Sequence, residues 1–224
     1  MTKVPFLVVF DVDGTLVDSQ DHICAAMSVA FAAVGLPEPP RARVVSIVGL
    51  SLPQAVATLA PDLAPAVQAR IVAAYKASFM PQSGAKPSPL FPGALAALDS
   101  LAGRADVILA VATGKSRRGL DRLIDRHGLT GRFQSRQVAD DHPSKPHPSM
   151  LLAALRETGV PADRAVMVGD TTYDIDMARA ASVTAIGVSW GYHPPEALTT
   201  AGAECLIAGF ADLVPALDRL WGRG

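Results

Sequence analysis

Four short apolar runs, spaced along the chain, restrict the fold more than any other feature of the sequence. They are FLVVF (6–10), VILAVA (107–112), AVMVG (165–169) and VTAIGV (183–188). The runs are nearly continuous and rich in β-branched residues, as in parallel strands that are buried on both faces. Stretches of helix-forming composition alternate with them, at 93–103, 116–127, 148–158 and 174–182. This alternation predicts an α/β fold with a doubly wound parallel sheet, and a weaker strand is expected at 134–138.

The segment between the first two runs is far longer than a crossover between parallel strands requires. Residues 19–35 have helical periodicity, and one face would carry Ile23, Met27, Ala30, Phe31 and Val34. Residues 65–79 show a less regular pattern of the same kind. Prolines interrupt the segment at 37, 39 and 40, and the stretch 80–93 has the proline and glycine content of a linker. We therefore predict a small all-helical insert.

Charge and cysteine content exclude several classes of protein. The formal net charge of −1 and the lack of a basic stripe argue against a nucleic-acid partner. No apolar stretch is long enough to span a membrane, and Asp11 and Asp13 interrupt the N-terminal apolar run before it could act as a signal peptide. Cys24 and Cys205 are far apart in sequence, so we expect them to be reduced and buried. The composition indicates a cytoplasmic protein that acts on small molecules.

Chemically useful side chains follow the predicted strands at their carboxyl ends, where α/β sheets bind ligands. These candidates are Asp11, Asp13, Thr113, Lys145, Asp170 and Asp174. Asp11 and Asp13 would point the same way from an extended segment, and a cation would relieve their repulsion. With Asp170, they offer the oxygen ligands that Mg²⁺ prefers. A solvated acidic turn is the alternative interpretation of DVDGT.

The remaining candidates are each weak when taken alone. Thr113 and Gly114 could bind a phosphate oxygen at a helix N-terminus, although a threonine before glycine is also an ordinary helix cap. Lys145 lies in a proline-rich loop and could neutralise a phosphate, although most loop lysines are only solvated. His142 and His147 have no third ligand at a suitable spacing, so we interpret them as loop residues.

Taken together, four segments resemble the motifs of the haloacid dehalogenase (HAD) superfamily. They are FDVDGT (10–15), VAT (111–113), KP (145–146) and VGDTTYD (168–174). The helical insert after VDS (17–19) resembles the cap of the subfamily that contains phosphoglycolate phosphatase and β-phosphoglucomutase, and GVSWGYHPPEAL (187–198) is also similar to phosphoglycolate phosphatases. The resemblance implies a Rossmann-like core formed by residues 1–17 and 88–224, and a helical cap domain formed by residues 18–87.

The resemblance also implies a mechanism. Asp11 would be the nucleophile that forms an aspartyl-phosphate, and Asp13 would be the general acid and base. Thr113, Gly114 and Lys145 would bind the phosphoryl group. Mg²⁺ would be held by Asp11, the backbone carbonyl of Asp13 and Asp170, with Asp174 supporting its outer shell. The implied function is a Mg²⁺-dependent phosphatase that hydrolyses a small phosphate monoester, similar to phosphoglycolate phosphatase.

Three alternatives stay open from the sequence: a phosphosugar mutase, a pyrophosphatase of the same superfamily, or a non-catalytic protein that binds phosphate esters. β-Phosphoglucomutases have a histidine at the position of Ile23 and cations on the cap loop, whereas the loop 48–56 has none here. Hydrolysis is therefore favoured. A substrate carboxylate would need a positive partner, for which the candidates are Arg41, Arg43, Arg70, Lys76 and Lys86. Both a monomer and a homodimer are compatible with the sequence.

Overall fold

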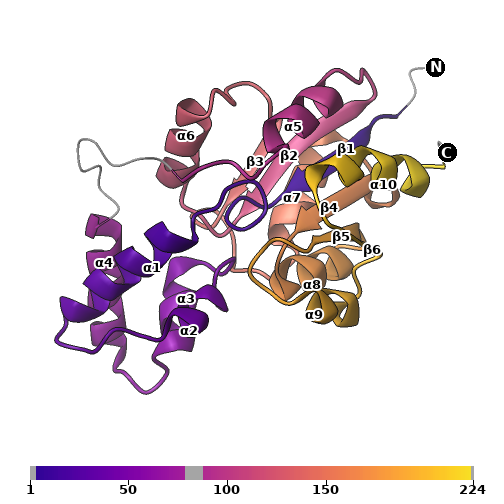
Figure 1. Ribbon diagram of the computed structural model, residues 1–224. Coiled ribbons are helices and arrows are strands. Elements are labelled where there is room, and N and C mark those ends of the chain that lie inside the picture. The colour runs from indigo at the N-terminus through magenta and orange to yellow at the C-terminus, as the bar shows by residue number, and fades with distance from the viewer. Residues whose placement is uncertain (1–3, 79–87, 223–224) are drawn as a thin grey trace.

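The computed structural model describes residues 4–78 and 88–222 and contains a six-stranded sheet (Figure 1). The strand order is β3-β2-β1-β4-β5-β6, and all neighbouring strands pair in parallel. The strands are β1 (Phe6–Phe10), β2 (Val107–Thr113), β3 (Ser135–Val138), β4 (Ala165–Gly169), β5 (Thr184–Val188) and β6 (Cys205–Ile207). The predicted α/β class with a doubly wound parallel sheet is confirmed.

Five of the six strands lie within one residue of the predicted positions. The exception is β6, which the sequence analysis missed because it has only three residues at the edge of the sheet. The edge position also explains a wrong prediction about cysteine. Cys24 is buried as expected, but Cys205, in β6, is only half-buried, and both are free thiols.

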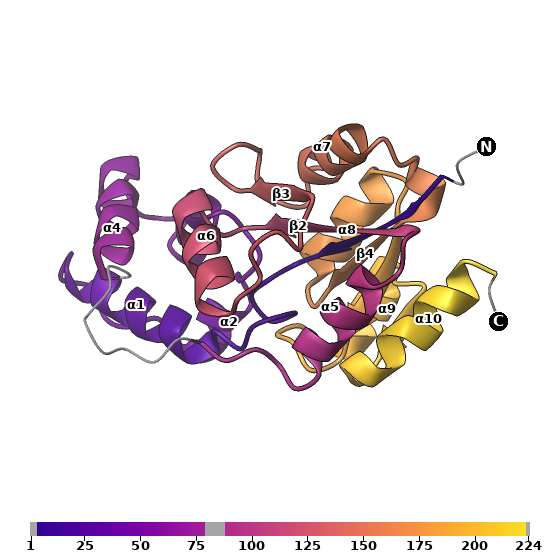
Figure 2. The same ribbon diagram turned by 90° about the horizontal axis from the view of Figure 1, so that it is seen from above.

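Helices cover both faces of the sheet (Figure 2). On one face, α5 (Ala94–Ala102), α6 (Arg117–Arg126) and α10 (Leu213–Leu220) pack on side chains such as Val8 and Phe10. On the other face, α7 (Ser149–Thr158) and α8 (Thr172–Ala180) pack around Leu7 and Val9, and α9 (Pro195–Ala201) joins this cluster through Leu198. The burial of both faces explains why the two central strands, β1 and β4, contain no polar residues. Two short 3₁₀ turns lie at Ala162–Arg164 and Phe210–Asp212.

Helix α8 begins two residues before its predicted start at 174. The difference follows from local capping, because Thr171 and Asp174 form a capping box at its N-terminus. The other three predicted core helices, α5, α6 and α7, lie within one residue of their predicted limits, whereas α9 and α10 were not predicted. No helix among the described residues is long and apolar enough to cross a membrane.

The helical insert contains α1 (Gln20–Ala32), α2 (Arg41–Val45), α3 (Leu52–Leu59) and α4 (Pro65–Ser78). These helices have their own apolar cluster, which includes Met27, Val56 and Ile71. The helices predicted at 19–35 and 65–79 are confirmed, but treating 48–56 as a loop was wrong in part. Helix α3 begins at Leu52, with Pro53 in its first turn, where a missing N–H has no cost. Most of the expected linker, residues 80–87, lies outside the described residues.

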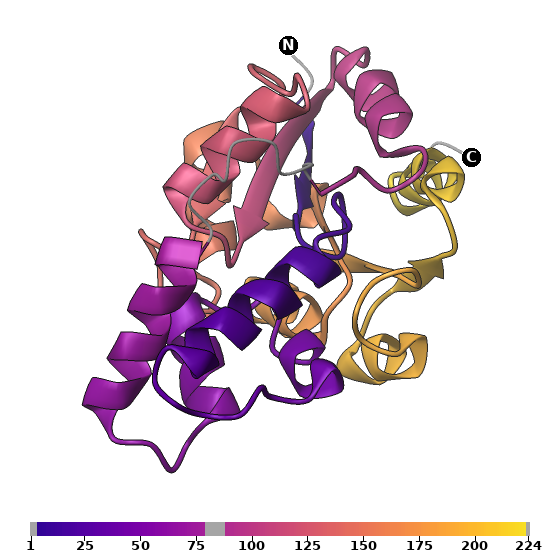
Figure 3. The same ribbon diagram turned by 60° about the vertical axis from the view of Figure 1, so that its left-hand side comes forward.

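The insert lies beyond the carboxyl ends of the central strands (Figure 3). Its segment 46–51 contacts the core through backbone atoms, and the Ser51 N–H donates a 2.9 Å hydrogen bond to Ser144 Oγ. Gly114 fits closely beneath it, since a Cβ atom there would lie 2.5 Å from the carbonyl oxygens of Gly49 and Leu50. The carboxyl edge of the sheet is therefore enclosed between the core loops and the insert.

Candidate active site

Asp11 and Asp170 follow adjacent strands at the point where the chain reverses its direction across the sheet. From β1 the chain runs outward to β2 and β3, then returns to β4 on the other side of β1. Ligands of open α/β sheets bind at this kind of crevice. The Asp11 N–H donates to Val168 O at 2.9 Å, which fixes the end of β1 against β4.

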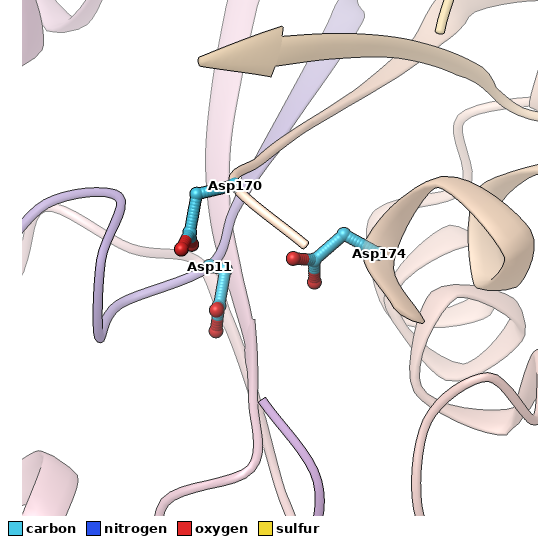
Figure 4. A group of neighbouring side chains, drawn as sticks. All are labelled: Asp11, Asp170 and Asp174. Carbon is cyan, nitrogen blue, oxygen red and sulfur yellow. The ribbon is translucent and has the colours of Figure 1, made fainter. Parts of the chain in front are cut away.

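Three buried carboxylates converge at this crevice, from Asp11, Asp170 and Asp174 (Figure 4). One oxygen atom from each residue lies within 4.8 Å of those of the other two. Among the described residues this is the only such group of metal-ligating side chains. The sequence prediction that Asp11 and Asp170 would meet is therefore confirmed in the geometry.

Asp170 is held by hydrogen bonds to both of its oxygens. Thr15 Oγ1 donates to Oδ1 at 2.8 Å, and the Tyr192 N–H donates to Oδ2 at 2.9 Å. Gly14 has a φ of +88° and lies so close that a Cβ atom would be 2.2 Å from Asp170 Oδ2. The Gly-Thr pair of DVDGT therefore has a physical reason, because glycine makes room for the carboxylate that threonine binds.

Lys145 is buried between two of the carboxylates. Its ammonium nitrogen lies 2.9 Å from Asp11 Oδ1 and 2.7 Å from Asp174 Oδ1. The alternative of a solvated loop lysine is wrong, since the side chain has no solvent exposure. Burial tends to lower the pKa of Lys145, but the charges of Asp11 and Asp174 outweigh this effect and raise it above its usual value.

One ammonium does not balance three buried carboxylates. Burial raises the pKa of Asp11 to about 7, against the opposing effect of Lys145, and Asp174 adds to the rise. Burial likewise raises the pKa of Asp170 well above its usual range, and Asp11 and Asp174 contribute. Apart from the ion pair with Lys145, the Asp11 carboxylate has no hydrogen-bond partner among the described residues. A divalent cation that prefers oxygen ligands fits this excess of negative charge.

Asp174 is held from two sides. Its Oδ2 accepts hydrogen bonds from the Thr171 N–H at 3.1 Å and from Thr171 Oγ1 at 2.7 Å, while Oδ1 pairs with Lys145. The residue thus caps α8 and stands in the acidic group at once, so the capping interpretation and the metal interpretation of GDTTYD are compatible. Its expected role in the outer shell of a metal stays a prediction.

Asp13 lies apart from the acidic group. Its Oδ1 accepts a 2.6 Å hydrogen bond from Ser19 Oγ and pairs with Lys115 Nζ at 2.9 Å. Asp11 and Asp13 therefore interact with different lysines, contrary to the expectation that one cation would relieve both. The turn at Gly14, with a φ of +88°, begins directly after Asp13. The predicted contribution of the Asp13 carbonyl to a metal site is not tested by this geometry.

Thr113 and Gly114 lie at the carboxyl end of β2, beside the acidic group of neighbouring β1. Thr113 is buried, and its Oγ1 accepts a hydrogen bond from the Lys115 N–H at 3.2 Å. The alternative that Thr113 caps the next helix is wrong, because the cap of α6 is Ser116, whose side chain accepts from the Gly119 N–H. Thr113 therefore stays a candidate for binding phosphate.

The sequence analysis missed three residues of this site: Ser19, Lys115 and Tyr192. Tyr192 bonds to Ser19 through its hydroxyl and to Asp170 through its backbone, although it lies far from both in sequence. Ser19 and Tyr192 fall inside segments that resembled the phosphatase subfamily, but spacing gave them no role. Lys115 directly follows the Thr113-Gly114 pair, and that adjacency was the available signal.

The other predicted residues lie outside the acidic group. His142 bonds to Ser149 Oγ and Gln137 Oε1, both at 2.8 Å, and burial lowers its pKa. In the insert, Arg41 pairs with Asp21, and Arg43 donates to the carbonyl oxygens of Thr58 and Leu59. Arg70 and Lys76 are exposed on α4, His147 is exposed in its loop, and Lys86 lies outside the described residues.

Comparison with known proteins agrees with this geometry. A family model, haloacid dehalogenase-like hydrolase, matches residues 8–188. The chain is 36% identical to "Probable phosphatase IndB" of Dickeya dadantii, with 96% of this chain and 94% of the relative covered. It is 33% identical to a phosphoglycolate phosphatase of Yersinia pestis, with coverages of 94% and 92%.

Solved structures match over nearly the whole chain. A hydrolase from Pseudomonas syringae superposes with a TM-score of 0.83 at 25% identity, covering 96% of this chain and 98% of that one. A haloacid dehalogenase-like family protein from Streptococcus pneumoniae gives a TM-score of 0.81 at 22% identity, with coverages of 96% and 99%. At these identities the likeness concerns the fold, and it extends over the core and the helical insert together.

Proposed function

Because the chain belongs to the haloacid dehalogenase-like hydrolases, we propose that it is a Mg²⁺-dependent phosphatase in which Asp11 forms an aspartyl-phosphate. The observation that carries the proposal is the buried Asp11 carboxylate, which has Lys145 as its only polar partner among the described residues. A carboxylate held in this way, at a ligand-binding crevice and beside two further acids, is available to attack phosphorus.

Residues of the core would hold the phosphoryl group and the metal. Lys145 pairs with Asp11, and Thr113 and Gly114 lie at the carboxyl end of neighbouring β2. These residues would supply a charge, a hydroxyl and a backbone N–H group for phosphate oxygens. Asp11, Asp170 and the carbonyl of Asp13 would hold Mg²⁺, with Asp174 in support. When bound, the metal would neutralise the charge that the phosphoryl group and the acids share.

The proposed reaction has two steps. In the first, an Asp11 oxygen forms a bond to phosphorus in line with the ester bond, which breaks as Asp13 gives its proton to the leaving alcohol. In the second, Asp13 removes a proton from water, the water oxygen bonds to phosphorus, and the bond to Asp11 breaks to release phosphate. Ser19 and Lys115 fix the Asp13 carboxyl through their contacts with its Oδ1.

The substrate is proposed to be a small phosphate ester, with phosphoglycolate as the first compound to test. The phosphoglycolate phosphatases among the relatives support this choice. The helical insert, residues 18–87, would act as the cap that excludes water and selects the substrate. Ile23 is buried within the insert, so nothing at that position offers the imidazole expected of a mutase. Transfer to water is therefore favoured over mutase chemistry.

Hydrolysis of p-nitrophenyl phosphate tests the proposal. We expect activity that requires Mg²⁺, stops with EDTA, and falls by at least about a thousandfold in Asp11→Asn, since removal of a nucleophile costs this much or more. Asp62→Asn, an exposed acid of the insert, is the matched control and should retain wild-type activity. Activity that persists in Asp11→Asn or in EDTA would contradict the nucleophile or the metal. Tight binding of phosphate esters without turnover would favour the non-catalytic alternative.

Ranking kcat/KM over phosphoglycolate, sugar phosphates, nucleoside monophosphates and pyrophosphate tests the substrate. A preference for phosphoglycolate of less than about tenfold, or about 1.4 kcal/mol, would leave that assignment unsupported.

A further inference from the structure

Four consecutive residues, Trp190–His193, contact three separate parts of the proposed site. We call them the strap. They follow β5 and lie between the core and the helical insert. Trp190 Nε1 donates to Thr15 O at 3.1 Å, and Gly191 passes so close to Asp170 that a Cβ atom would lie 2.0 Å from its Cβ. The strap is therefore packed directly against the loop and the carboxylate that form the acidic group.

Tyr192 joins the acidic group to the start of the insert. Its N–H donates to Asp170 Oδ2 at 2.9 Å, and its hydroxyl oxygen accepts from the Ser19 N–H at 3.1 Å. Ser19 Oγ donates to Asp13 at 2.6 Å, so the 3.2 Å contact between Ser19 Oγ and the Tyr192 hydroxyl uses the tyrosine proton. Ser19 immediately precedes α1, the first helix of the insert. Tyr192 thus connects Asp170 to the start of the insert directly, and to Asp13 through Ser19.

His193 joins the strap to a second point on the insert, the C-terminal end of α2. Its Nδ1 accepts from the Thr172 N–H at 3.2 Å, which places the ring proton on Nε2. That nitrogen donates to Ser46 O at 3.1 Å. The His193 N–H also donates to Asp170 O at 3.3 Å. His193 therefore bonds both to the insert and to the backbone of Asp170.

Ser46 O accepts a second hydrogen bond from the core, from the Tyr173 hydroxyl at 3.1 Å. Ser46 ends α2, where carbonyl groups have no partner within the helix. Tyr173 packs edge-to-face on His193, with ring centroids 5.3 Å apart. Tyr173 and His193 therefore make the same kind of contact with the insert, but only His193 belongs to the strap that binds Asp170.

We propose that Tyr192 and His193 are positioning residues that couple seating of the insert on the core to the geometry of Asp170. The inference rests on the proposed function, because it takes Asp170 as a metal ligand and the insert as a cap. Neither residue would touch the reacting atoms. By thermodynamic reciprocity, a variant that loosens the insert at the strap must weaken metal binding, and metal binding must tighten the insert.

Calorimetric titration with MgCl₂ tests the coupling. We expect Tyr192→Phe and His193→Ala each to weaken Mg²⁺ binding by about fivefold or more, the usual lower range for coupled sites. Tyr173→Phe is the matched control, because it removes one bond to Ser46 O, keeps the ring that packs on His193 and breaks no hydrogen bond of the strap. It should change Mg²⁺ affinity by less than about twofold. His193→Gln, which retains an N–H donor, should recover part of the loss. Equal losses in His193→Ala and Tyr173→Phe, or none in either strap variant, would overturn the inference.

Hydrogen exchange gives a second measurement that needs neither metal nor turnover. In metal-free protein, His193→Ala should accelerate exchange at the Tyr192 amide, and Tyr192→Phe should accelerate exchange at the amides of 47–51. If each substitution accelerates amide exchange only next to the substituted residue, the coupling is overturned even if Mg²⁺ binds. If wild-type protein fails to bind Mg²⁺ while exchange changes at both ends, the strap stands and the proposed metal chemistry fails.

Discussion

The carboxyl edge of the sheet and the helical insert use polar groups in different ways. At the sheet edge, side chains meet: Lys145 is buried between Asp11 and Asp174. In the insert, Arg41 and Arg43 bind other groups of the insert. The segment 46–51 of the insert meets the core through backbone atoms of Ser46, Gly49, Leu50 and Ser51. The candidate catalytic side chains therefore lie in the core.

The largest effect expected from this difference concerns lysines of the two regions. Lys145→Met would leave three buried carboxylates without their ammonium, and breaking a buried pair costs about 3–5 kcal/mol. Lys76→Met, on the exposed surface of α4, should cost less than about 0.5 kcal/mol. Urea unfolding without Mg²⁺ measures both, and added Mg²⁺ should recover part of the loss in Lys145→Met. Similar losses in the two variants would contradict the comparison.

The backbone contact between the regions can be tested at Gly114. Gly114→Ala places a methyl group 2.5 Å from the Gly49 and Leu50 carbonyl oxygens, so the insert must shift. Overpacking of this kind costs about 1–3 kcal/mol, and we expect kcat/KM to fall by about tenfold with little change in core stability. Gly103→Ala, where the nearest atom would lie at an ordinary 3.5 Å, is the matched control. A wild-type kcat/KM in Gly114→Ala would show that catalysis does not depend on the close contact between Gly114 and the insert.

A smaller effect is expected from Asp11 in metal-free protein. Its pKa is about 7 in the fold and near 4 in an unfolded chain, so the unfolded state loses this proton first as pH rises. Stability therefore falls between about pH 4 and pH 7 and stays reduced above that range. Asp11→Asn should raise the Tm at pH 8 by roughly 2–4 °C for each kcal/mol regained, but not at pH 4. A lower Tm for Asp11→Asn at pH 8 would contradict the assignment.

The smallest effect is expected at the surface of the insert. Arg41→Gln breaks an exposed ion pair with Asp21, and such pairs contribute little because water and salt screen them. We expect kcat/KM for any substrate to change by less than about twofold. A selective loss for one acidic substrate would instead assign Arg41 to substrate binding and would weaken the distinction between the two regions.

The sequence was informative where physical constraints are local. Buried parallel strands require continuous apolar runs, so β1, β2, β4 and β5 could be located closely. The carboxyl ends of parallel strands lie at one edge of the sheet, which brings Asp11 and Asp170 together. Lys145 lies in the loop before α7, and Asp174 lies in the first turn of α8, directly after β4. Their positions in the motifs therefore assigned them to the same candidate site as Asp11 and Asp170.

Contacts between segments that are distant in the chain could not be predicted from the sequence. Tyr192 meets Ser19 across a large separation in sequence, and Lys115 reaches Asp13 from the loop that follows the neighbouring strand β2. The insert offered even less information, because Ser46 and Ser51 contact the core through groups that every residue carries. A backbone contact has no signature in residue type, so short helices such as α2 and their seating on the core required the structure.

The most direct test of the account is to find where the phosphoryl group goes. Wild-type protein with Mg²⁺ and p-nitrophenyl phosphate should be quenched in acid during turnover and digested, and its peptides weighed by mass spectrometry. We predict a phosphoryl group on Asp11 and none in Asp11→Asn. Turnover with a phosphoryl group on another residue, or with none trapped under conditions that preserve acyl phosphates, would contradict the claim that Asp11 is the nucleophile.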